Sequence, residues 1–183
     1  MSESSAITPM KILLVEANPR DVHFLSVYIS QAGTSQFEVT HAETLAHALQ
    51  SISAASFDII LLDLALPDAQ GLSAFLQINE KAAGVPVVVL TGGLESSIGL
   101  KAVQAGAQDY LPKEELDSHV LVRAMRYAIE RKRTAVQLLE ANKALQVEIV
   151  ERKRAEDALA IKAQELLVPM PNCLNLFMRW PMT

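Results

Sequence analysis

The chain has 183 residues, of which 50% are hydrophobic and 20% are charged, so it is long enough to bury a core and predicts one globular domain with an appendage rather than two full domains. No segment reaches the roughly 18 consecutive apolar residues of a membrane-spanning helix, and the N-terminus lacks the pattern of a signal peptide, so we expect a cytoplasmic protein without a membrane segment. The single cysteine, Cys173, excludes an internal disulfide and a cysteine-based metal site.

The formal net charge of -5 is divided unevenly along the chain. Residues 1–116 carry 5 basic and 13 acidic side chains, whereas residues 117–183 carry 11 basic and 8 acidic ones. The basic side chains of the second part are interleaved with glutamates, as on a solvated helix face, and form no recognition-helix or basic-region pattern. The sequence therefore does not favour nucleic-acid binding, and its four histidines lack the spacing of a zinc site.

The predicted elements alternate between strand and helix along the chain. KILLV (11–15) predicts a first strand, and residues 20–33 then place apolar side chains on one helix face before Gly33, a typical helix end. Further strands are predicted at FEVTH (37–41), DIILL (58–62), VPVVVL (85–90) and DYLPK (109–113), with helices at 42–53, 71–84 and 96–106 between them.

Strands made largely of Ile, Leu and Val, joined by helices of about a dozen residues, predict a parallel sheet covered on both faces. Each crossover should be right-handed. In an open sheet of this kind, ligands bind beyond the carboxyl ends of the strands. The residues that follow the predicted strands are therefore the first candidates for a functional site.

Polar side chains stand at the ends of four of the five predicted strands. They are Glu16 after the first strand, Asp63 after the third, Thr91 after the fourth and Lys113 at the end of the fifth. Two neighbouring carboxylates can hold Mg²⁺, which prefers oxygen ligands. A hydroxyl and an ammonium group could then contact the oxygens of a phosphoryl group attached to one carboxylate. We interpret the set as a site for an acyl phosphate.

Four segments together resemble the receiver domain of response regulators. ILLVEANPRD resembles the first strand and acidic loop of that family, DIILLDLALPDAQGL the phosphoacceptor strand and its loop, VVVLTGG the switch strand, and GAQDYLPK the final strand. The resemblance covers residues 11 to about 130 and implies an α/β fold, a flavodoxin-like doubly wound sheet of five parallel strands in the order 2-1-3-4-5, here with an extended C-terminal helix. It also implies a protein of two-component signalling that is no enzyme beyond slow self-phosphorylation and dephosphorylation.

The resemblance implies a role for each matching position. Asp63 would accept a phosphoryl group from a histidine kinase or phosphotransfer protein, and Thr91 and Lys113 would bind the phosphate. Gly92 would leave the phosphate accessible, and Tyr110 would change rotamer as the signal is read out. The alternative for Asp63 is a helix cap, which would leave Thr91 and Lys113 unexplained. Tyr110 could equally be a packed strand residue.

The same resemblance implies Mg²⁺ as a cofactor, held by Asp63, Glu16 and the backbone carbonyl of Ala65. Glu16 could instead be a solvated loop acid. The family usually has a second acid after the first strand, where this chain has Ala17. Because the loss of a negative ligand weakens Mg²⁺ binding, phosphorylation of Asp63 is expected to be slow or lost. The alternatives are a pseudo-receiver that acts as a protein-interaction module, and a phosphatase of the haloacid dehalogenase type, which needs an acid at the position of Ala65.

Residues 117–166 contain neither Gly nor Pro and predict one long helix, which Asp117 or Ser118 could cap. We expect a parallel homodimer through a seven-residue seam of this helix, in which Asn142 would fix the register; a lone helix folded back on the receiver is the alternative. The seam comprises Leu121, Ala128, Ala135, Asn142, Ile149 and Ala163 at one position and Ala124, Leu138, Leu145, Leu159 and Leu166 at the other, with Arg131, Arg152 and Glu156 interrupting it.

The stretch LQVEIVERKRAEDAL of this helix also resembles the linkers that join receivers to sensor or histidine-kinase modules.

The expected organisation has four parts. A flexible N-terminus (1–9) precedes the receiver domain (10–130), and a helical coiled-coil linker (131–167) follows it. Residues 168–183 shift to Pro, Met and aromatic side chains without periodicity, which predicts an irregular or disordered tail.

Overall fold

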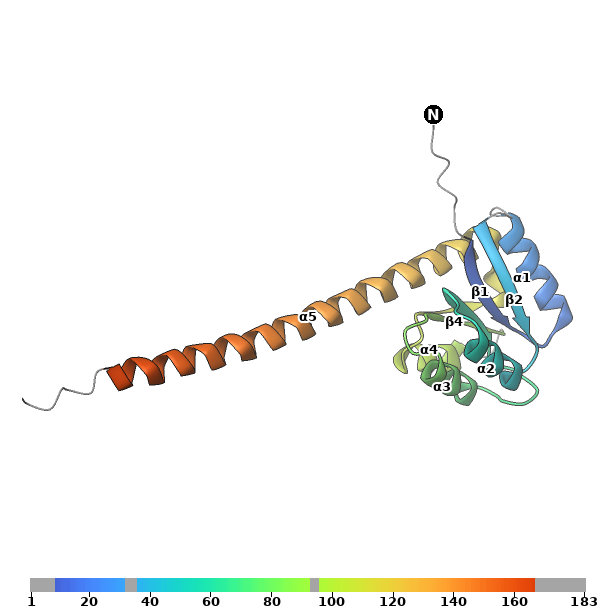
Figure 1. The fold of residues 1–183 in the computed structure, drawn as a ribbon. Coiled ribbons are helices and arrows are strands. Elements are labelled where there is room, and N and C mark those ends of the chain that lie inside the picture. Colours follow the sequence, from blue (N-terminus) through green and yellow to red (C-terminus); the bar gives the residue numbers. More distant parts are fainter. Residues whose placement is uncertain (1–8, 32–35, 93–95, 167–183) are drawn as a thin grey trace, which may run out of the picture. The chain divides into compact units, whose positions relative to one another are not determined.

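The computed structural model describes residues 9–31, 36–92 and 96–166. The strands are β1 (Met10–Val15), β2 (Phe37–Ala42), β3 (Ile59–Asp63), β4 (Val87–Thr91) and β5 (Asp109–Pro112). The helices are α1 (Pro19–Gln31), α2 (Leu45–Ala54), α3 (Leu72–Lys81), α4 (Ser96–Gln104) and α5 (Ser118–Leu166), with a short 3-10 helix, η2 (Lys113–Glu115), after β5. Strand and helix alternate as predicted (Figure 1).

The chain divides into two compact units, residues 1–136 and residues 137–183. The first unit contains the sheet, α1 to α4 and the start of α5, and the second contains the remainder of α5. The expected flexible N-terminus, apart from Pro9, and the expected irregular tail lie outside the described residues. Within the described part of the chain, none of the helices has both the length and the apolar content that crossing a membrane requires.

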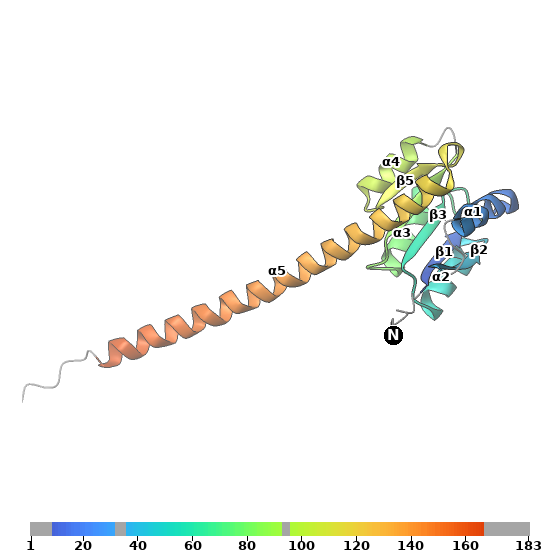
Figure 2. The same cartoon turned by 90° about the horizontal axis from the view of Figure 1, so that it is seen from above.

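The five strands form one parallel sheet of order β2-β1-β3-β4-β5, which confirms the predicted fold. β3 is the middle strand, and Figure 2 shows it between β1 and β5. From β1 the chain first adds β2 on one side and then β3, β4 and β5 on the other. Open parallel sheets bind their ligands beyond the carboxyl ends of the strands at such a reversal, which here lies between β1 and β3.

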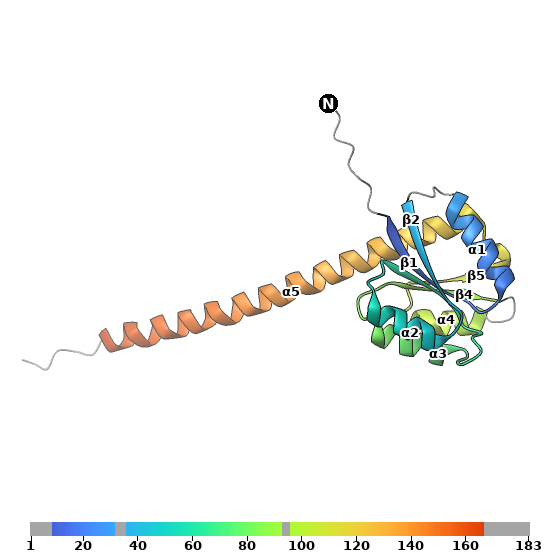
Figure 3. The same cartoon turned by 45° about the vertical axis from the view of Figure 1, so that its right-hand side comes forward.

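Helices cover both faces of the sheet. Because successive strand side chains point to opposite faces, Leu13 and Val15 pack with α2, α3 and α4, whereas Ile12 and Leu14 pack with α1 and the start of α5. Figure 3 shows α2, α3 and α4 together on one side of the sheet and α1 on the other. These four β1 side chains are fully buried, and each such burial stabilises the fold by about 1.5–3 kcal/mol. Two-sided burial explains why the strands are continuous apolar runs rather than alternating ones.

The polar ends of β3 and β4 differ slightly from the prediction. Asp63 and Thr91 are the last residues of their strands rather than the first residues of the following loops. β4 begins at Val87, two residues later than predicted, because Pro86 has no N–H to donate to the sheet. Pro86 contributes only its carbonyl, which accepts a hydrogen bond from the Ile60 amide at 3.0 Å.

α1 starts directly beyond the carboxyl end of β1. The Asn18 side-chain oxygen accepts a hydrogen bond from the Arg20 amide at 3.0 Å, as an N-cap does. Pro19 occupies the first helical position, where its missing N–H is not needed. These residues place the first turn of α1 at the edge of the sheet where the candidate site is expected. The predicted helix end at Gly33 lies outside the described residues.

α2 is capped from two directions. The Thr44 hydroxyl accepts a hydrogen bond from the His47 amide at 3.1 Å. The Asp68 carboxylate, from the loop after β3, accepts hydrogen bonds from the amides of Leu45 and Ala46 at 2.8 and 2.9 Å. These two backbone donors lower the pKa of Asp68. The loop that follows the candidate acceptor is thus attached to the N-terminus of α2.

α5 begins as predicted, because the Asp117 carboxylate accepts a hydrogen bond from the Val120 amide at 2.7 Å. The buried side chains of its first turns belong to the core on the α1 side of the sheet; they are Leu121, Ala124, Met125 and Ala128. Three of these four residues were expected in the seam with a partner helix. The first part of the seam prediction is therefore wrong, because these side chains pack against the sheet of their own chain and not against a partner helix.

Candidate functional site

The strand ends bring the predicted polar residues to one edge of the sheet. In the strand register, Asp63 lies beside Leu90 and Thr91 lies beside Pro112, the residue before Lys113. Glu16 follows Val15, the last residue of β1. The carboxyl ends of four neighbouring parallel strands therefore supply two acids, a hydroxyl and an ammonium group to the same edge.

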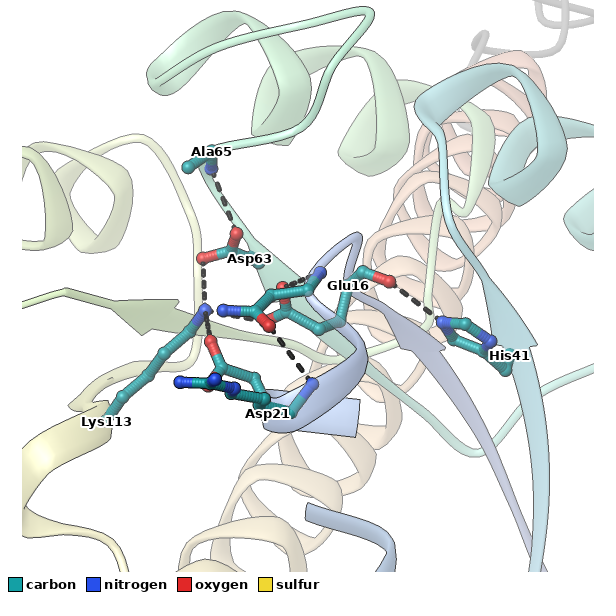
Figure 4. A network of polar contacts seen from close by, with 8 residues as sticks. Glu16, Asp21, His41, Asp63, Ala65 and Lys113 are labelled. Atoms are coloured by element: carbon teal, nitrogen blue, oxygen red, sulfur yellow. Dashed lines mark hydrogen bonds and ion pairs between the residues drawn. The ribbon is translucent and has the colours of Figure 1, made fainter. Parts of the chain in front are cut away.

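Lys113 is the centre of the polar network at this edge (Figure 4). Its Nζ lies 2.6 Å from Glu16 Oε2, 2.9 Å from Asp21 Oδ2 and 3.0 Å from Asp63 Oδ1. An ammonium group has three N–H donors and no acceptor, so three carboxylates from β1, α1 and β3 match its capacity. These distances bring Glu16, Asp63 and Lys113 together, whereas Thr91, the fourth residue expected at this edge, makes no side-chain hydrogen bond to any described residue.

Asp63 is almost completely buried, with 3% of its surface exposed. One carboxylate oxygen contacts Lys113, and the other, Oδ2, accepts a hydrogen bond from the Ala65 amide at 3.3 Å. Ala65 also pairs with Gln70 in an isolated antiparallel bridge, and the Gly71 amide donates to the Leu64 carbonyl at 2.8 Å. The loop after β3 is therefore closed on itself directly beside the carboxylate.

Glu16 is buried and held at three atoms, so it is not a solvated loop acid. Its Oε1 accepts a hydrogen bond from the Asn18 amide at 2.9 Å, and its Oε2 accepts one from Lys113. Its backbone carbonyl accepts from His41 Nε2 at 2.8 Å. Burial raises the pKa of Glu16, and the hydrogen bonds from Lys113 and Asn18 oppose part of that rise.

The Lys113 ammonium is held in its charged form. Burial alone would lower the pKa of Lys113. The hydrogen bonds to Asp21 and Glu16 and the charge of Asp63 act in the opposite direction and outweigh burial, so the pKa of Lys113 is raised. The network thus consists of three carboxylate side chains around the positively charged Lys113 ammonium group.

Thr91 has an unusual side chain for a buried position. The residue is completely buried, and its hydroxyl oxygen has no hydrogen-bond partner among the described residues. A buried polar group without a partner costs about 1–3 kcal/mol. This unpartnered hydroxyl belongs to the last residue of β4, the strand that pairs with β3.

Tyr110 packs where α4 has a glycine. A Cβ atom at Gly99 would lie 2.6 Å from Tyr110 Cδ2 and 3.1 Å from Thr91 Cγ2, so only a glycine lets the ring lie this close to the helix. Tyr110 is half-buried and packs against the core on the α2–α4 side. Its role as a rotamer switch stays a prediction. At Gly92, an added Cβ would meet none of the described residues within 4 Å, and the role of this glycine also stays a prediction.

Asp21 is the residue of the network that the sequence analysis missed. It lies in the first turn of α1. The sequence feature that could have indicated it is the helix cap at Asn18 followed by Pro19, which places this first turn immediately beyond the carboxyl end of β1. An acid in that turn is therefore close to Glu16, although nothing in the spacing alone indicates that it reaches Lys113.

The oxygen donors at this edge are the candidates for Mg²⁺ binding. Among the described residues, no group of three or more His, Cys, Asp and Glu side chains is arranged to hold a metal ion. The two predicted carboxylates, Glu16 and Asp63, do converge on one point, which the Lys113 ammonium occupies. Because Mg²⁺ binds oxygen and retains several waters, two carboxylates and a carbonyl fit its chemistry. The individual ligand roles, including that of the Ala65 carbonyl, stay predictions.

A family model described as the response regulator receiver domain matches residues 12–126. The chain belongs to this family. Receiver domains are not classical enzymes, and they generally bind Mg²⁺.

Known relatives agree with this assignment. The chain is 32% identical over 163 residues to SilR of Salmonella typhimurium, named as a probable transcriptional regulatory protein, covering 85% of this chain and 68% of that one. It is 35% identical over 120 residues to the transcriptional regulatory protein BasR of Escherichia coli, covering 63% of this chain and 52% of BasR. Apart from SilR, the chain spans about half the length of the curated relatives it matches.

A solved structure supports the fold independently. The response regulator receiver domain protein (CheY-like) from Methanospirillum hungatei is similar with a TM-score of 0.61 and 20% identity, covering 70% of this chain and 99% of that one. At this identity the likeness concerns the fold alone. The predicted receiver fold is therefore confirmed by the family match and by the sheet order together.

Proposed function

We propose that this receiver accepts a phosphoryl group on Asp63 from a histidine kinase or phosphotransfer protein in the cytoplasm. The observation that carries the proposal is the pairing of a buried acceptor with a neighbouring cation, the 3.0 Å contact between Asp63 Oδ1 and Lys113 Nζ. The unpartnered Thr91 hydroxyl supports it, because a phosphoryl oxygen would supply the missing hydrogen-bond partner.

The proposed reaction is a transfer between two protein side chains. A carboxylate oxygen of Asp63 forms a bond to phosphorus while the P–N bond of the donor phosphohistidine breaks. The electron pair of that bond returns to the imidazole nitrogen, which takes up a proton. Lys113 would pair with one phosphoryl oxygen and Thr91 with another.

Glu16, Asp63 and the carbonyl of Ala65 are the residues that would hold Mg²⁺. When bound, the ion would neutralise charge that develops on the transferred group. Ala17 contributes no carboxylate to this set, so we expect a weak site. The competing proposal, a pseudo-receiver that works only as a protein-interaction module, is favoured by the same residue and by the fact that Lys113 already pairs with all three acids.

The readout is proposed to pass through α5, which would dimerise as a parallel coiled coil from residue 135 onward. Every seam residue in this part is exposed to solvent: Ala135, Leu138, Asn142, Leu145, Ile149, Leu159, Ala163 and Leu166. Leu138, Leu145 and Leu159 expose 55–68% of their surface, a cost that burial against a second copy would remove. The polar seam positions Arg152 and Glu156 pair with each other at 3.0 Å within one helix, so a partner need not satisfy them.

One experiment addresses both parts of the proposal. The protein is incubated with acetyl phosphate and Mg²⁺, and intact mass and sedimentation equilibrium are measured before and after. We expect a mass gain of one phosphoryl group in the wild type and in the control Asp58→Asn, and none in Asp63→Asn. We also expect the wild type to be a dimer. Leu145→Asp, in the seam, should dissociate it, and Lys143→Asp, outside the seam, should leave it intact. No mass gain at any Mg²⁺ concentration would favour the pseudo-receiver, and a monomeric wild type would exclude the coiled coil.

A further inference from the structure

The acid that the family pattern has at position 17 is absent from this chain, yet three carboxylates still surround Lys113. Two of them, Glu16 and Asp63, are expected from the pattern. The third is Asp21, whose Oδ2 lies 2.9 Å from Lys113 Nζ and accepts a hydrogen bond from it. Figure 4 shows Asp21 and Asp63 on opposite sides of the ammonium group.

We propose that Asp21 is a positioning residue that supplies the negative charge absent at Ala17 and holds the Lys113 ammonium beside Asp63. The inference rests on the proposed function, because Lys113 matters for the reaction only if Asp63 is the acceptor. It concerns an acid on α1, four residues away from the position where the family carries its second acid.

The first argument is the geometry of the ammonium group. Lys113 has three N–H donors, and its three carboxylate neighbours come from three different elements: the end of β1, the first turn of α1 and the end of β3. Three anchors in different directions fix the position of a flexible four-carbon side chain. With Asp21 removed, only the two strand-end acids remain, and the ammonium loses its contact on the helix side.

The second argument is charge. Glu16 and Asp63 are both nearly fully buried, at 1% and 3% exposure, and burial of like charges side by side is unfavourable without a cation between them. Asp21 is more exposed, at 29% for its side chain, so it adds negative charge to the site at a smaller desolvation cost. It strengthens the field that keeps Lys113 charged and in place.

The third argument links Asp21 to Ala17. An acid at position 17 would add a fourth carboxylate to a site that has a single ammonium group, and the contact from Asp21 would then be one of several. Residues that share one partner are energetically coupled, by amounts that correspond to about twofold to a hundredfold in an equilibrium or rate. The effect of removing Asp21 should therefore depend on which residue stands at position 17.

The test is a cycle of four proteins: wild type, Asp21→Asn, Ala17→Asp and the double variant. Glu38→Gln, which removes an exposed acid on β2 away from the site, is the control for charge alone. Two quantities are measured. The first is the NMR signal of the Lys113 ammonium protons, which needs no phosphoryl donor. The second is the rate of phosphorylation of Asp63 by acetyl phosphate.

We expect Asp21→Asn to speed solvent exchange of the Lys113 ammonium protons and to slow phosphorylation roughly tenfold, while Glu38→Gln changes neither. In the Ala17→Asp background the same substitution should change the rate by less than about twofold. A purely structural role for Asp21 in the first turn of α1 would alter the unfolding free energy but not the ammonium signal. That result, or equal slowing in both backgrounds, would overturn the inference. If the wild type is not phosphorylated at all, the proposed function fails, and the ammonium signal still decides whether Asp21 holds Lys113.

Discussion

Replacement of Thr91 by valine is expected to stabilise the unphosphorylated protein. Valine has nearly the shape of threonine, so the substitution exchanges the hydroxyl for a methyl group. The hydroxyl is fully buried and has no hydrogen-bond partner among the described residues. Most substitutions at buried positions destabilise, so a gain in stability here would be a specific signature of an unsatisfied group.

The magnitude follows from the cost of that group. A buried polar atom without a partner costs about 1–3 kcal/mol. Since the new methyl group is not fitted to its surroundings, part of this gain will be lost. We expect the unfolding free energy to rise by about 1 kcal/mol, equivalent to roughly 2–4 °C in Tm. With beryllofluoride and Mg²⁺ added, the order should reverse, because only the wild-type hydroxyl can bond to the bound phosphoryl analogue.

The assay is urea unfolding followed by circular dichroism, with and without beryllofluoride and Mg²⁺. Thr40→Val, also on a strand of the sheet, controls for the higher strand propensity of valine. A loss of 1 kcal/mol or more in Thr91→Val without ligand would show that the hydroxyl has a partner in the resting protein. The argument that it is reserved for a phosphoryl oxygen would then be refuted.

Two further outcomes follow from the structure. Gly99→Ala adds a Cβ 2.6 Å from the Tyr110 ring, so we expect overpacking to destabilise the protein by about 1–3 kcal/mol despite the better helix propensity of alanine. In a Tyr110→Ala background the same change should destabilise less, because only the 3.1 Å contact with Thr91 Cγ2 remains against the better helix propensity of alanine, and equal destabilisation by urea titration in both backgrounds would contradict the packing argument. The pKa of Asp68 is lowered from 3.8 in the folded protein, so its stabilising contribution is present above that pH and is lost as the pH falls through the folded value. Asp68→Asn should therefore lower the unfolding free energy at neutral pH, with the difference from wild type shrinking below about pH 4, and a difference that stays constant with pH would argue against the capping role.

The sheet and its polar edge were predictable because two simple rules apply to them. Continuous apolar strands require cover on both faces, and parallel strands bring their carboxyl ends together. Glu16, Asp63 and Lys113 therefore follow from strand positions alone. The strand limits were off by one or two residues because backbone pairing, and not the apolar run, sets them. β4 starts only after Pro86, which has no N–H, and β3 continues through the polar residue Asp63, which pairs with Leu90.

Contacts between elements were harder to foresee. Asp21 sits on a helix, and its reach to Lys113 depends on how α1 is oriented at the end of β1, which no spacing in the sequence encodes. The heptad pattern of α5 failed in its first turns for a related reason. A repeat identifies an apolar face but not its partner, and Leu121 and Ala128 pack on the sheet of their own chain.

Among the described residues, the loop after β3 is held by more contacts than the segment after β4, so the two sides of the site differ in how firmly they are fixed. On one side, Asp63 is flanked by a closed turn at Ala65 that is also fastened to α2 through Asp68. On the opposite side, among the described residues, the Thr91 hydroxyl has no hydrogen-bond partner, a Cβ at Gly92 would meet nothing within 4 Å, and Tyr110 packs against α4 at Gly99. Movement in response to chemistry at Asp63 should therefore concentrate in β4, α4 and β5, and a partner that senses the modified state would do best to contact that side.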